Sequence, residues 1–342
     1  MTLVTTLVTL LLAEVILRFF FADYLYSGSG LRSLYYSTPN LTISEDNRSV
    51  HYTPNTDIRS ITVYYNRIEY DTLHHANNLG FLSDQNYTKE PKPGIVFLGD
   101  SFTAGVGSTS PWIPQLDKKY PDINLYSFGV TGTGIPNFYR TLKTFLNDLN
   151  FDTIVIMSIS DDLRRHQWYP FEQEGYLYFC YDKKVGENCR KKQRIAKLIQ
   201  RDIEASSLLQ PEEPYILKAY QVIKKRLSTP KQKQKLSEKA RLRMLIPPNQ
   251  HYDINDVKKI KALADRTGKR VIFIHIPEKN EIQIGYYRCN VQEEMKKLGI
   301  AYYPLLHTHH FDLSMYHKHD GHPNDKGYAY IASIIEKILK LH

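Results

Sequence analysis

The hydrophobic residues follow a regular pattern from about residue 94 to the C-terminus. Short apolar runs alternate there with polar turns, and most of the turns lead into a segment with helical periodicity. This alternation is typical of a parallel sheet with helices on both faces. The apolar runs predict strands over 95–98, 124–128, 153–157, 270–276 and 301–305, and the periodic segments predict helices over 137–149, 254–267, 291–298 and 324–341. We therefore expect residues 91–342 to form an α/β domain, a three-layer α/β/α sandwich around a five-stranded parallel sheet.

The first 22 residues have a different composition from the rest of the chain. The segment 3–22 is nearly all apolar, interrupted only by threonines, Glu14 and Arg18, and it has about the length that a helix needs to cross a bilayer. A cleaved signal peptide would begin with basic residues, and this segment has none before Arg18. We therefore expect residues 1–22 to be a transmembrane anchor. Glu14 and Arg18, four residues apart, are expected to pair, either as a tolerated pair near the interface or to dock on a membrane-protein partner.

Two further segments lie outside the regular pattern. Residues 23–90 form a lead-in rich in Ser, Thr, Asn and Tyr, with short strands expected near 61–65. Residues 164–250 are too long for a plain crossover and predict a basic helical insertion. Between residues 183 and 243 there are eighteen Lys or Arg and six Asp or Glu, a net charge of +12, whereas the whole chain carries +9. This charge indicates either a solvated helical surface or a surface for an anionic partner near the membrane, and no motif for nucleic acid accompanies it.

The cysteines give information about the cellular compartment in which the domain folds. Cys180 and Cys189 enclose a short loop that contains turn-forming residues, so they form either a disulfide or two buried thiols, whereas Cys289 has no obvious mate. A disulfide would imply an oxidising compartment. Together with the apolar leader, the pair favours a domain on the extracytoplasmic side of the membrane.

The candidate chemistry lies at the two ends of the predicted sheet domain. Ser101 follows the first strand in the sequence Gly99-Asp100-Ser101, at the carboxyl edge where α/β sheets bind ligands. A serine nucleophile needs an imidazole to accept its proton and a carboxylate to orient the imidazole. Asp320 and His322, which flank a glycine just before the last helix, supply both groups from one turn.

These two blocks, in this order, resemble the first and last signature blocks of the GDSL/SGNH hydrolase family. The segments 77–81 (Asn-Asn-Leu-Gly-Phe) and 128–132 (Phe-Gly-Val-Thr-Gly) resemble further blocks of its anchored bacterial members. The resemblance implies an SGNH/flavodoxin-like fold, a triad of Ser101, His322 and Asp320, and no cofactor. It also implies an oxyanion hole made by the backbone N–H groups of Ser101 and Gly132.

Two features depart from the family pattern. A single residue separates Asp320 from His322, a spacing that resembles polysaccharide O-acetyltransferases related to alginate acetylation and also some anchored hydrolases. The third block of the family carries an Asn that donates to the oxyanion, and this chain has Ser158-Ile159-Ser160-Asp161-Asp162 instead. Either Ser160 fills that position and keeps a donor, or Asp161 fills it and presents a carboxylate to a developing negative charge.

The sequence thus predicts a serine esterase or O-acyltransferase that acts on ester groups of a cell-surface glycan, with O-acetyl groups as the preferred substrate. One alternative is a hydrolase of lipids or small esters. The other is a weakly active SGNH domain that serves as a binding or assembly subunit of a membrane acyltransferase system. We expect no metal, because the five histidines between 307 and 319 follow no known ligand spacing, and no nucleic-acid partner.

Overall fold

A computed structural model describes residues 2–21, 34–37, 41–64, 67–165, 169–173, 176–180, 189–191, 214–228 and 250–341. Most of the basic insertion expected over 164–250 lies outside these residues. Residue 22 of the expected anchor and residues 23–33 of the lead-in also lie outside them.

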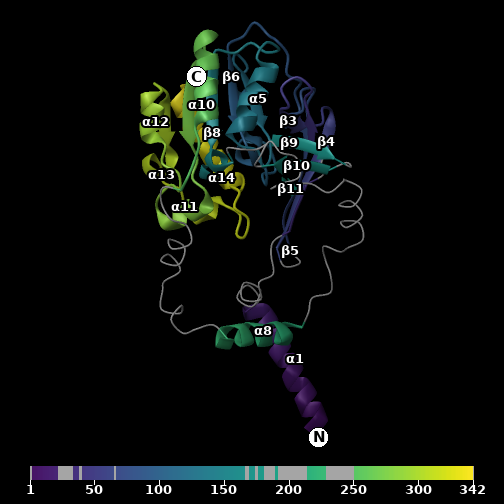
Figure 1. The fold of residues 1–342 in the computed structure, drawn as a ribbon. Helices are drawn as coiled ribbons and strands as arrows, with labels where there is room; N and C mark the ends of the chain where they lie inside the picture. Colours follow the sequence, from purple (N-terminus) through teal and green to yellow (C-terminus); the bar gives the residue numbers. More distant parts are fainter. Residues whose placement is uncertain are drawn as a thin grey trace.

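Five parallel strands form the central sheet, as the sequence predicts (Figure 1). Their order across the sheet is β13-β12-β8-β6-β7, so the first strand of the domain lies next to the middle of the sheet. The strands are β6 (Gly94–Gly99), β7 (Asn124–Gly129), β8 (Thr153–Ser158), β12 (Arg270–His275) and β13 (Ala301–Pro304). Because β7 and β8 both pair with β6 in parallel, the carboxyl ends of these three strands lie side by side at one edge of the sheet.

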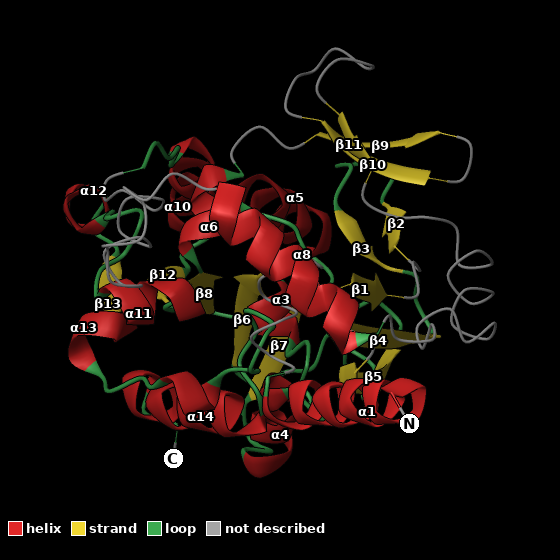
Figure 2. Ribbon diagram, turned by 90° about the horizontal axis from the view of Figure 1, so that it is seen from below, coloured by secondary structure: helices red, strands yellow, loops and turns green. Residues whose placement is uncertain are grey.

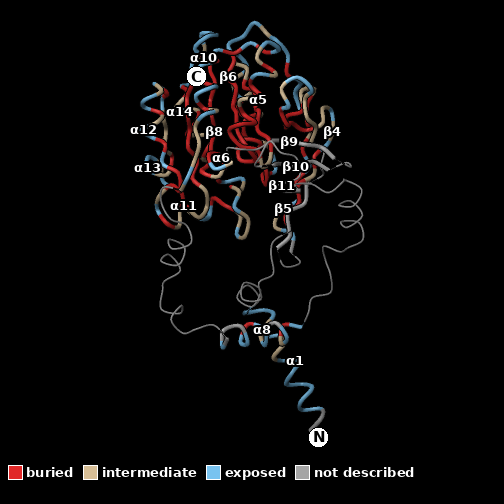
Figure 3. Tube along the Cα trace, in the orientation of Figure 1, coloured by how far each residue is buried: buried red, intermediate tan, exposed pale blue. Residues whose placement is uncertain are grey.

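Helices cover both faces of this sheet, which makes the expected three layers. Alternate residues of β6 show why: Val96 and Leu98 belong to one hydrophobic core, whereas Ile95 and Phe97 belong to the other. Figure 2 shows α5 (Ile135–Phe145) and α10 (Asn255–Arg266) on one side of the sheet, and α4 (Trp112–Lys119) and α14 (Asp325–Leu339) on the opposite side. Figure 3 shows that the strands between them are buried. The remaining helices of the sheet domain are α3 (Ser101–Ala104), α6 (Ser160–Arg164), α11 (Lys279–Ile284), α12 (Gln292–Lys297), α13 (Leu305–Thr308) and the 3₁₀ turn η3 (Leu313–Met315).

The lead-in contains longer strands than the sequence suggested. β4 (Thr56–Tyr64) and β5 (Arg67–Ala76) form an antiparallel hairpin of nine and ten residues, and β1 (Leu34–Ser37) extends it, while β2 (Leu41–Ile43) pairs with β3 (Val50–Tyr52). The hairpin is not a separate unit, since Ile58 and Tyr70 share a core with β6 and α5.

The turn at 77–81 ties the lead-in to the sheet. The side chain of Asn77 accepts hydrogen bonds from the backbone N–H groups of Leu79 (3.0 Å) and Phe81 (3.1 Å). Gly80 has a positive φ of 79°, and a Cβ on it would lie 2.0 Å from the carbonyl oxygen of Tyr52. Asn77 is therefore required for the hydrogen bonds of the turn, and Gly80 is required for its positive φ and for the close contact with the backbone of Tyr52.

The N-terminal helix α1 (Thr2–Phe20) contacts α8 (Tyr215–Ser228). Glu14 and Arg18 form the expected pair at 3.5 Å, and Glu14 also accepts hydrogen bonds from the backbone N–H groups of Tyr215 and Ile216. This pair therefore has a partner within its own chain. In the described residues no helix is long and apolar enough to cross a membrane, so the transmembrane helix expected over 1–22 is not supported.

The three-stranded sheet of β9 (Tyr169–Gln173), β10 (Tyr176–Cys180) and β11 (Cys189–Lys191) starts the insertion. Its register places Cys180 directly opposite Cys189 on neighbouring antiparallel strands. Such a position lies within the reach of a disulfide, and the bond itself remains a prediction because both side chains lie outside the described part of the structure.

Candidate active site

The turn after β6 places Ser101 at the carboxyl edge of the sheet. Asp100 ends the strand, and its carboxylate accepts a hydrogen bond from the backbone N–H of Phe102 at 2.9 Å, which starts the short helix α3. α3 lies against the end of β7, because a Cβ on Gly129 would come within 2.2 Å of the backbone nitrogen of Ala104. The glycine thus lets the turn that carries Ser101 sit directly on the neighbouring strand.

The loop 317–322 lies opposite this turn and leads into the last helix. Its base is closed by a hydrogen bond from the backbone N–H of His317 to the carbonyl of His322 (3.0 Å). Asn324 then caps α14 by accepting from the backbone N–H of Gly327 at 3.1 Å. A capped helix and a closed loop fix the direction in which residues 320 and 322 project.

Ser101, His322 and Asp320 form one continuous chain of hydrogen bonds. Nε2 of His322 lies 2.8 Å from Oγ of Ser101. Nδ1 of His322 forms a short hydrogen bond with Oδ1 of Asp320, which also accepts from the backbone N–H of His322 at 2.8 Å. The structure therefore brings together the three residues that the sequence proposed as a triad, in the order nucleophile, imidazole and carboxylate.

The pKa values of the pair differ from their ordinary values in opposite directions. Burial disfavours the charged imidazole, but the Asp320 carboxylate outweighs it, so the pKa of His322 is raised above its ordinary value of 6.5. Burial alone would raise the pKa of Asp320, yet its contact with His322 lowers that pKa to about 2. Asp320 therefore stays ionised, and His322 becomes a stronger base.

A cleft of about 680 Å³ opens over the three residues. Gly132, which follows β7 with a positive φ of 67°, also borders it. The backbone N–H of Ser101 has no acceptor among the described residues, so it is available to a ligand. Most of the other residues that border the cleft are of polar or charged types, although their exposed surface includes much apolar area: Leu41, Asp100, Phe102, Thr131, Ile159, Asp161, Arg165, Glu278, Lys279, Asn280, Gln283, His319 and Gly321.

Ser160 and Asp161, the two alternatives for the third block, face different surroundings. Ser160 is fully buried at the start of α6, and its Oγ lies 3.2 Å from Nε2 of His275 and accepts from the backbone N–H of Cys289 at 3.3 Å. Its hydroxyl is therefore turned away from the cleft, whereas Asp161 borders the cleft.

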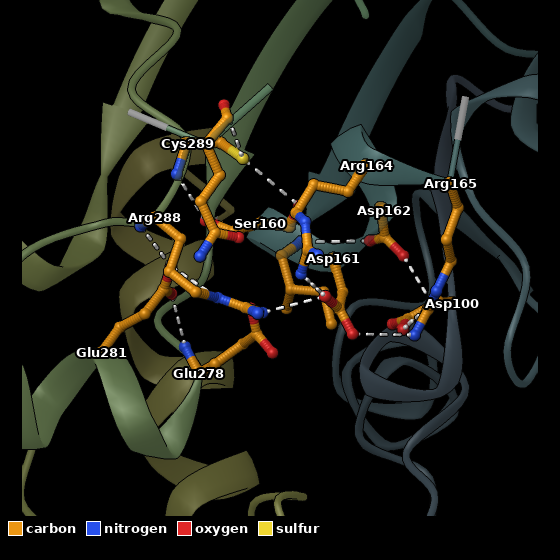
Figure 4. A network of polar contacts seen from close by, with 12 residues as sticks. Asp100, Ser160, Asp161, Asp162, Arg164, Arg165, Glu278, Glu281, Arg288 and Cys289 are labelled. Atoms are coloured by element: carbon orange, nitrogen blue, oxygen red, sulfur yellow. Dashed lines mark hydrogen bonds and ion pairs between the residues drawn. The ribbon is translucent and has the colours of Figure 1, made fainter. Parts of the chain in front are cut away.

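Three arginines surround Asp161 (Figure 4). Its carboxylate lies 2.9 Å from Arg164, 3.0 Å from Arg288 and 3.4 Å from Arg165. Burial would raise the pKa of Asp161, but these cations lower it below its ordinary value. The cleft thus contains an ionised carboxylate that its neighbours largely neutralise.

Arg165 was not identified from the sequence. Its guanidinium donates to the carbonyl of Thr133 at 2.8 Å and contacts the carboxylates of Asp162 (3.0 Å) and Asp100 (3.3 Å). It therefore links the segment 160–162 to Asp100, the residue beside Ser101. The signal in the sequence was the pair Arg164 and Arg165, which lie three and four positions after Asp161, and such i,i+3 and i,i+4 pairs are common on any helix.

The histidines between 307 and 319 do not gather around one point. His317 lies 2.8 Å from the carbonyl oxygen of Gly107 and packs against the ring of Tyr70. The described residues contain no group of three His, Cys, Asp or Glu side chains that could hold a metal.

Comparisons with known proteins give distant structural neighbours. No family model and no curated protein matches the sequence. Among solved structures, a lipase/acylhydrolase from Enterococcus faecalis is 13% identical, with a TM-score of 0.37 over 72% of this chain and 95% of the other. The SGNH-hydrolase family esterase AlinE4 is 12% identical, with a TM-score of 0.30 over 74% and 97% of the two chains. A protein from Lactobacillus plantarum is 14% identical, with a TM-score of 0.35 over 75% and 99%. Similarities this weak do not establish a family, so any assignment must rest on the site itself.

The raised pKa of His322 predicts the pH dependence of the site. Since only the neutral imidazole accepts the serine proton, kcat/KM for an ester should fall as the pH drops, with its midpoint above pH 6.5. A pH–rate profile of the protein on p-nitrophenyl acetate tests this. A midpoint at or below 6.5 would contradict the proposed pairing of His322 with Asp320.

The charge of Asp161 predicts the effect of a neutral amide at this position. Asp161→Asn removes a negative charge from the cleft and offers an N–H donor, so kcat should rise by up to about tenfold. This gain is smaller than the roughly 100- to 1000-fold in kcat that a well-placed oxyanion donor contributes in other enzymes. The measurement is kcat on p-nitrophenyl acetate, with thermal unfolding followed alongside.

Ser160→Ala is the matched control for this variant. Its kcat should stay within about threefold of wild type, whereas its free energy of unfolding should fall by about 1–3 kcal/mol because buried groups of His275 and Cys289 lose a partner. A large loss of turnover in Ser160→Ala, with no gain in Asp161→Asn, would instead make Ser160 the donor.

Proposed function

We propose that this chain is a serine esterase or O-acyltransferase of the GDSL/SGNH type, with Ser101 as its nucleophile. The observation that carries the proposal is the chain of hydrogen bonds from Ser101 through His322 to Asp320 at the floor of the cleft. A serine linked in this way to an imidazole and a carboxylate is the arrangement that activates a hydroxyl for acyl transfer.

The reaction follows from the positions of these groups. Oγ of Ser101 attacks the carbonyl carbon of an ester while Nε2 of His322 takes the hydroxyl proton. The oxyanion of the tetrahedral intermediate accepts hydrogen bonds from the backbone N–H groups of Ser101 and Gly132. Collapse of the intermediate expels the alcohol, which takes the proton from His322 and leaves an acyl-serine. Water, or the hydroxyl of an acceptor, then attacks the acyl-serine by the same steps in reverse, and Asp320 orients His322 throughout.

The lining of the cleft favours a small acyl group on a polar alcohol. Leu41, Phe102 and Ile159 are the large apolar side chains of the lining, and charged or amide side chains make up most of the remainder. A long acyl chain would need an extended apolar surface. O-acetyl groups on a cell-surface glycan fit this lining better than a lipid does, and such a substrate would require the domain to lie outside the cytoplasm.

Asp161 supports a second candidate function. An ionised carboxylate beside the site of oxyanion formation opposes catalysis. It is consistent with a weakly active domain that binds an ester-bearing partner as a subunit of a membrane acyltransferase system. In that case Ser101 would be dispensable for the function of the assembly.

Acetate release from an O-acetylated oligosaccharide tests the proposal. Ser101→Ala and His322→Ala should each lower kcat by at least about 1000-fold, since members of a triad act as a unit. Ser127→Ala, which changes another buried serine near the sheet edge, should keep activity within about threefold. Turnover on p-nitrophenyl palmitate should be far below that on p-nitrophenyl acetate.

Two outcomes would count against this proposal. Equal rates in wild type and Ser101→Ala would remove the serine mechanism and leave the binding-subunit function. Preference for the palmitate ester would keep the mechanism and replace the glycan with a lipid substrate.

A further inference from the structure

The loop that carries Asp320 is held from outside by a residue of the lead-in hairpin. The carboxylate of Glu69, in β5, accepts hydrogen bonds from two successive backbone N–H groups, those of His319 (2.6 Å) and Asp320 (2.9 Å). Each carboxylate oxygen takes one donor. Hydrogen bonds to an ionised acceptor are about twice as strong as those between neutral groups, so Glu69 fixes both peptide units at once.

A lysine holds the carbonyl groups of the same loop. Nζ of Lys279, the first residue of α11, donates to the carbonyl oxygens of His317 (2.6 Å) and Lys318 (2.5 Å), and it lies 3.4 Å from that of Asp320. Glu69 and Lys279 thus bind the N–H groups and the carbonyl groups of residues 317–320 with opposite charges. Neither contact involves a side chain of the triad.

These contacts determine where the Asp320 side chain points. The loop is short, and its ends are already tied by the hydrogen bond between His317 and His322. Only the peptide units between the ends can still turn, and Glu69 and Lys279 bind those units. A turn of the Asp320 peptides would swing its carboxylate away from Nδ1 of His322. A misplacement of about 1 Å in a catalytic constellation can lower the rate by about 100-fold.

We propose that Glu69 and Lys279 form a clasp that positions Asp320 for catalysis, and this inference rests on the proposed serine mechanism. Both are positioning residues, because they act on the backbone of the loop. The β4–β5 hairpin is then part of the catalytic apparatus. Its next residue, Tyr70, supports the same loop by packing on the ring of His317 at a centroid distance of 4.6 Å.

Steady-state kinetics of Glu69→Gln give the first test. A Gln side chain has one acceptor oxygen, and its amide N–H₂ would face the second backbone N–H, so the clasp opens on one side. We expect kcat on p-nitrophenyl acetate to fall by about 10- to 100-fold. KM should change by less than about threefold, because Glu69 does not border the cleft.

Asp71→Asn is the matched control. Asp71 lies in the same strand and makes a salt bridge across the hairpin with Arg59 at 2.6 Å, without touching the loop. If Asp71→Asn lowers kcat as much as Glu69→Gln at equal thermal stability, the effect belongs to the hairpin as a whole and the clasp is overturned.

The pKa of His322 distinguishes a positioning effect of Glu69 and Lys279 from a purely electrostatic effect of their charges. The charged groups around this imidazole are Asp320 in the same loop, Asp100 beside the nucleophile and Arg165 after α6, with Glu69 and Lys279 at the loop backbone. If Glu69 and Lys279 acted only as charges, removing the anion would lower the pKa of His322 and removing the cation in Lys279→Met would raise it. If they position Asp320, both variants lower that pKa, because the Asp320 carboxylate moves away.

An NMR titration of the histidines measures this pKa without any turnover, with the His322 signal assigned by its loss in His322→Ala. A fall in both Glu69→Gln and Lys279→Met supports the clasp, and any other combination overturns it. The two proposals can also fail separately. A wild-type protein without esterase activity removes the serine mechanism, whereas Ser101-dependent activity that Glu69→Gln leaves intact removes the clasp alone.

Discussion

The contact between Ser101 and His322 joins two segments that lie 221 positions apart in the chain, and the candidate active site depends on it. The sheet holds Ser101 at its carboxyl edge, and the cap of the last helix holds the loop of His322. The two sides of the contact share one hydrophobic core, since Phe102, next to Ser101, and Ile331 of α14 are both buried in it. Ser101 and His322 can therefore meet only when the turn after β6 and α14 are packed together in this core.

A cluster of charges surrounds this contact and links the elements at the sheet edge. Asp161 lies between Arg165, which reaches the residue beside the nucleophile, and Arg288, which reaches Glu278 at the start of α11 (Figure 4). The carboxylates of the cluster do not behave alike: the surrounding arginines outweigh burial and lower the pKa of Asp161, whereas burial and the nearby carboxylates of Glu281 and Asp161 raise the pKa of Glu278 to about 8. The cluster gives the floor of the cleft a fixed arrangement, and it supplies positive charge close to the carboxylate of Asp161.

The sequence predicted the sheet and the proximity of Ser101, His322 and Asp320, for physical reasons that differ. Runs such as 95–98 and 153–157 are apolar on both faces, which few structures other than a buried parallel strand require. Asp320 and His322 could be recognised as a pair in the sequence because they lie two positions apart in one turn. The orientation of Ser160 and the arginines around Asp161 could not be predicted, because they depend on contacts with His275 and Arg288, more than 100 positions away. Glu69 was missed for the same reason, since a single Glu in a strand carries no signal of the loop that it binds.

The central claim is that Ser101 is an activated nucleophile, and covalent labelling tests it most directly. The protein would be treated with a fluorophosphonate ester, which reacts with activated serines, and digested for mass spectrometry. The account predicts a single modified residue, Ser101, and loss of that modification in His322→Ala. No labelling of Ser101 in the folded wild-type protein, or equal labelling in His322→Ala, would contradict it.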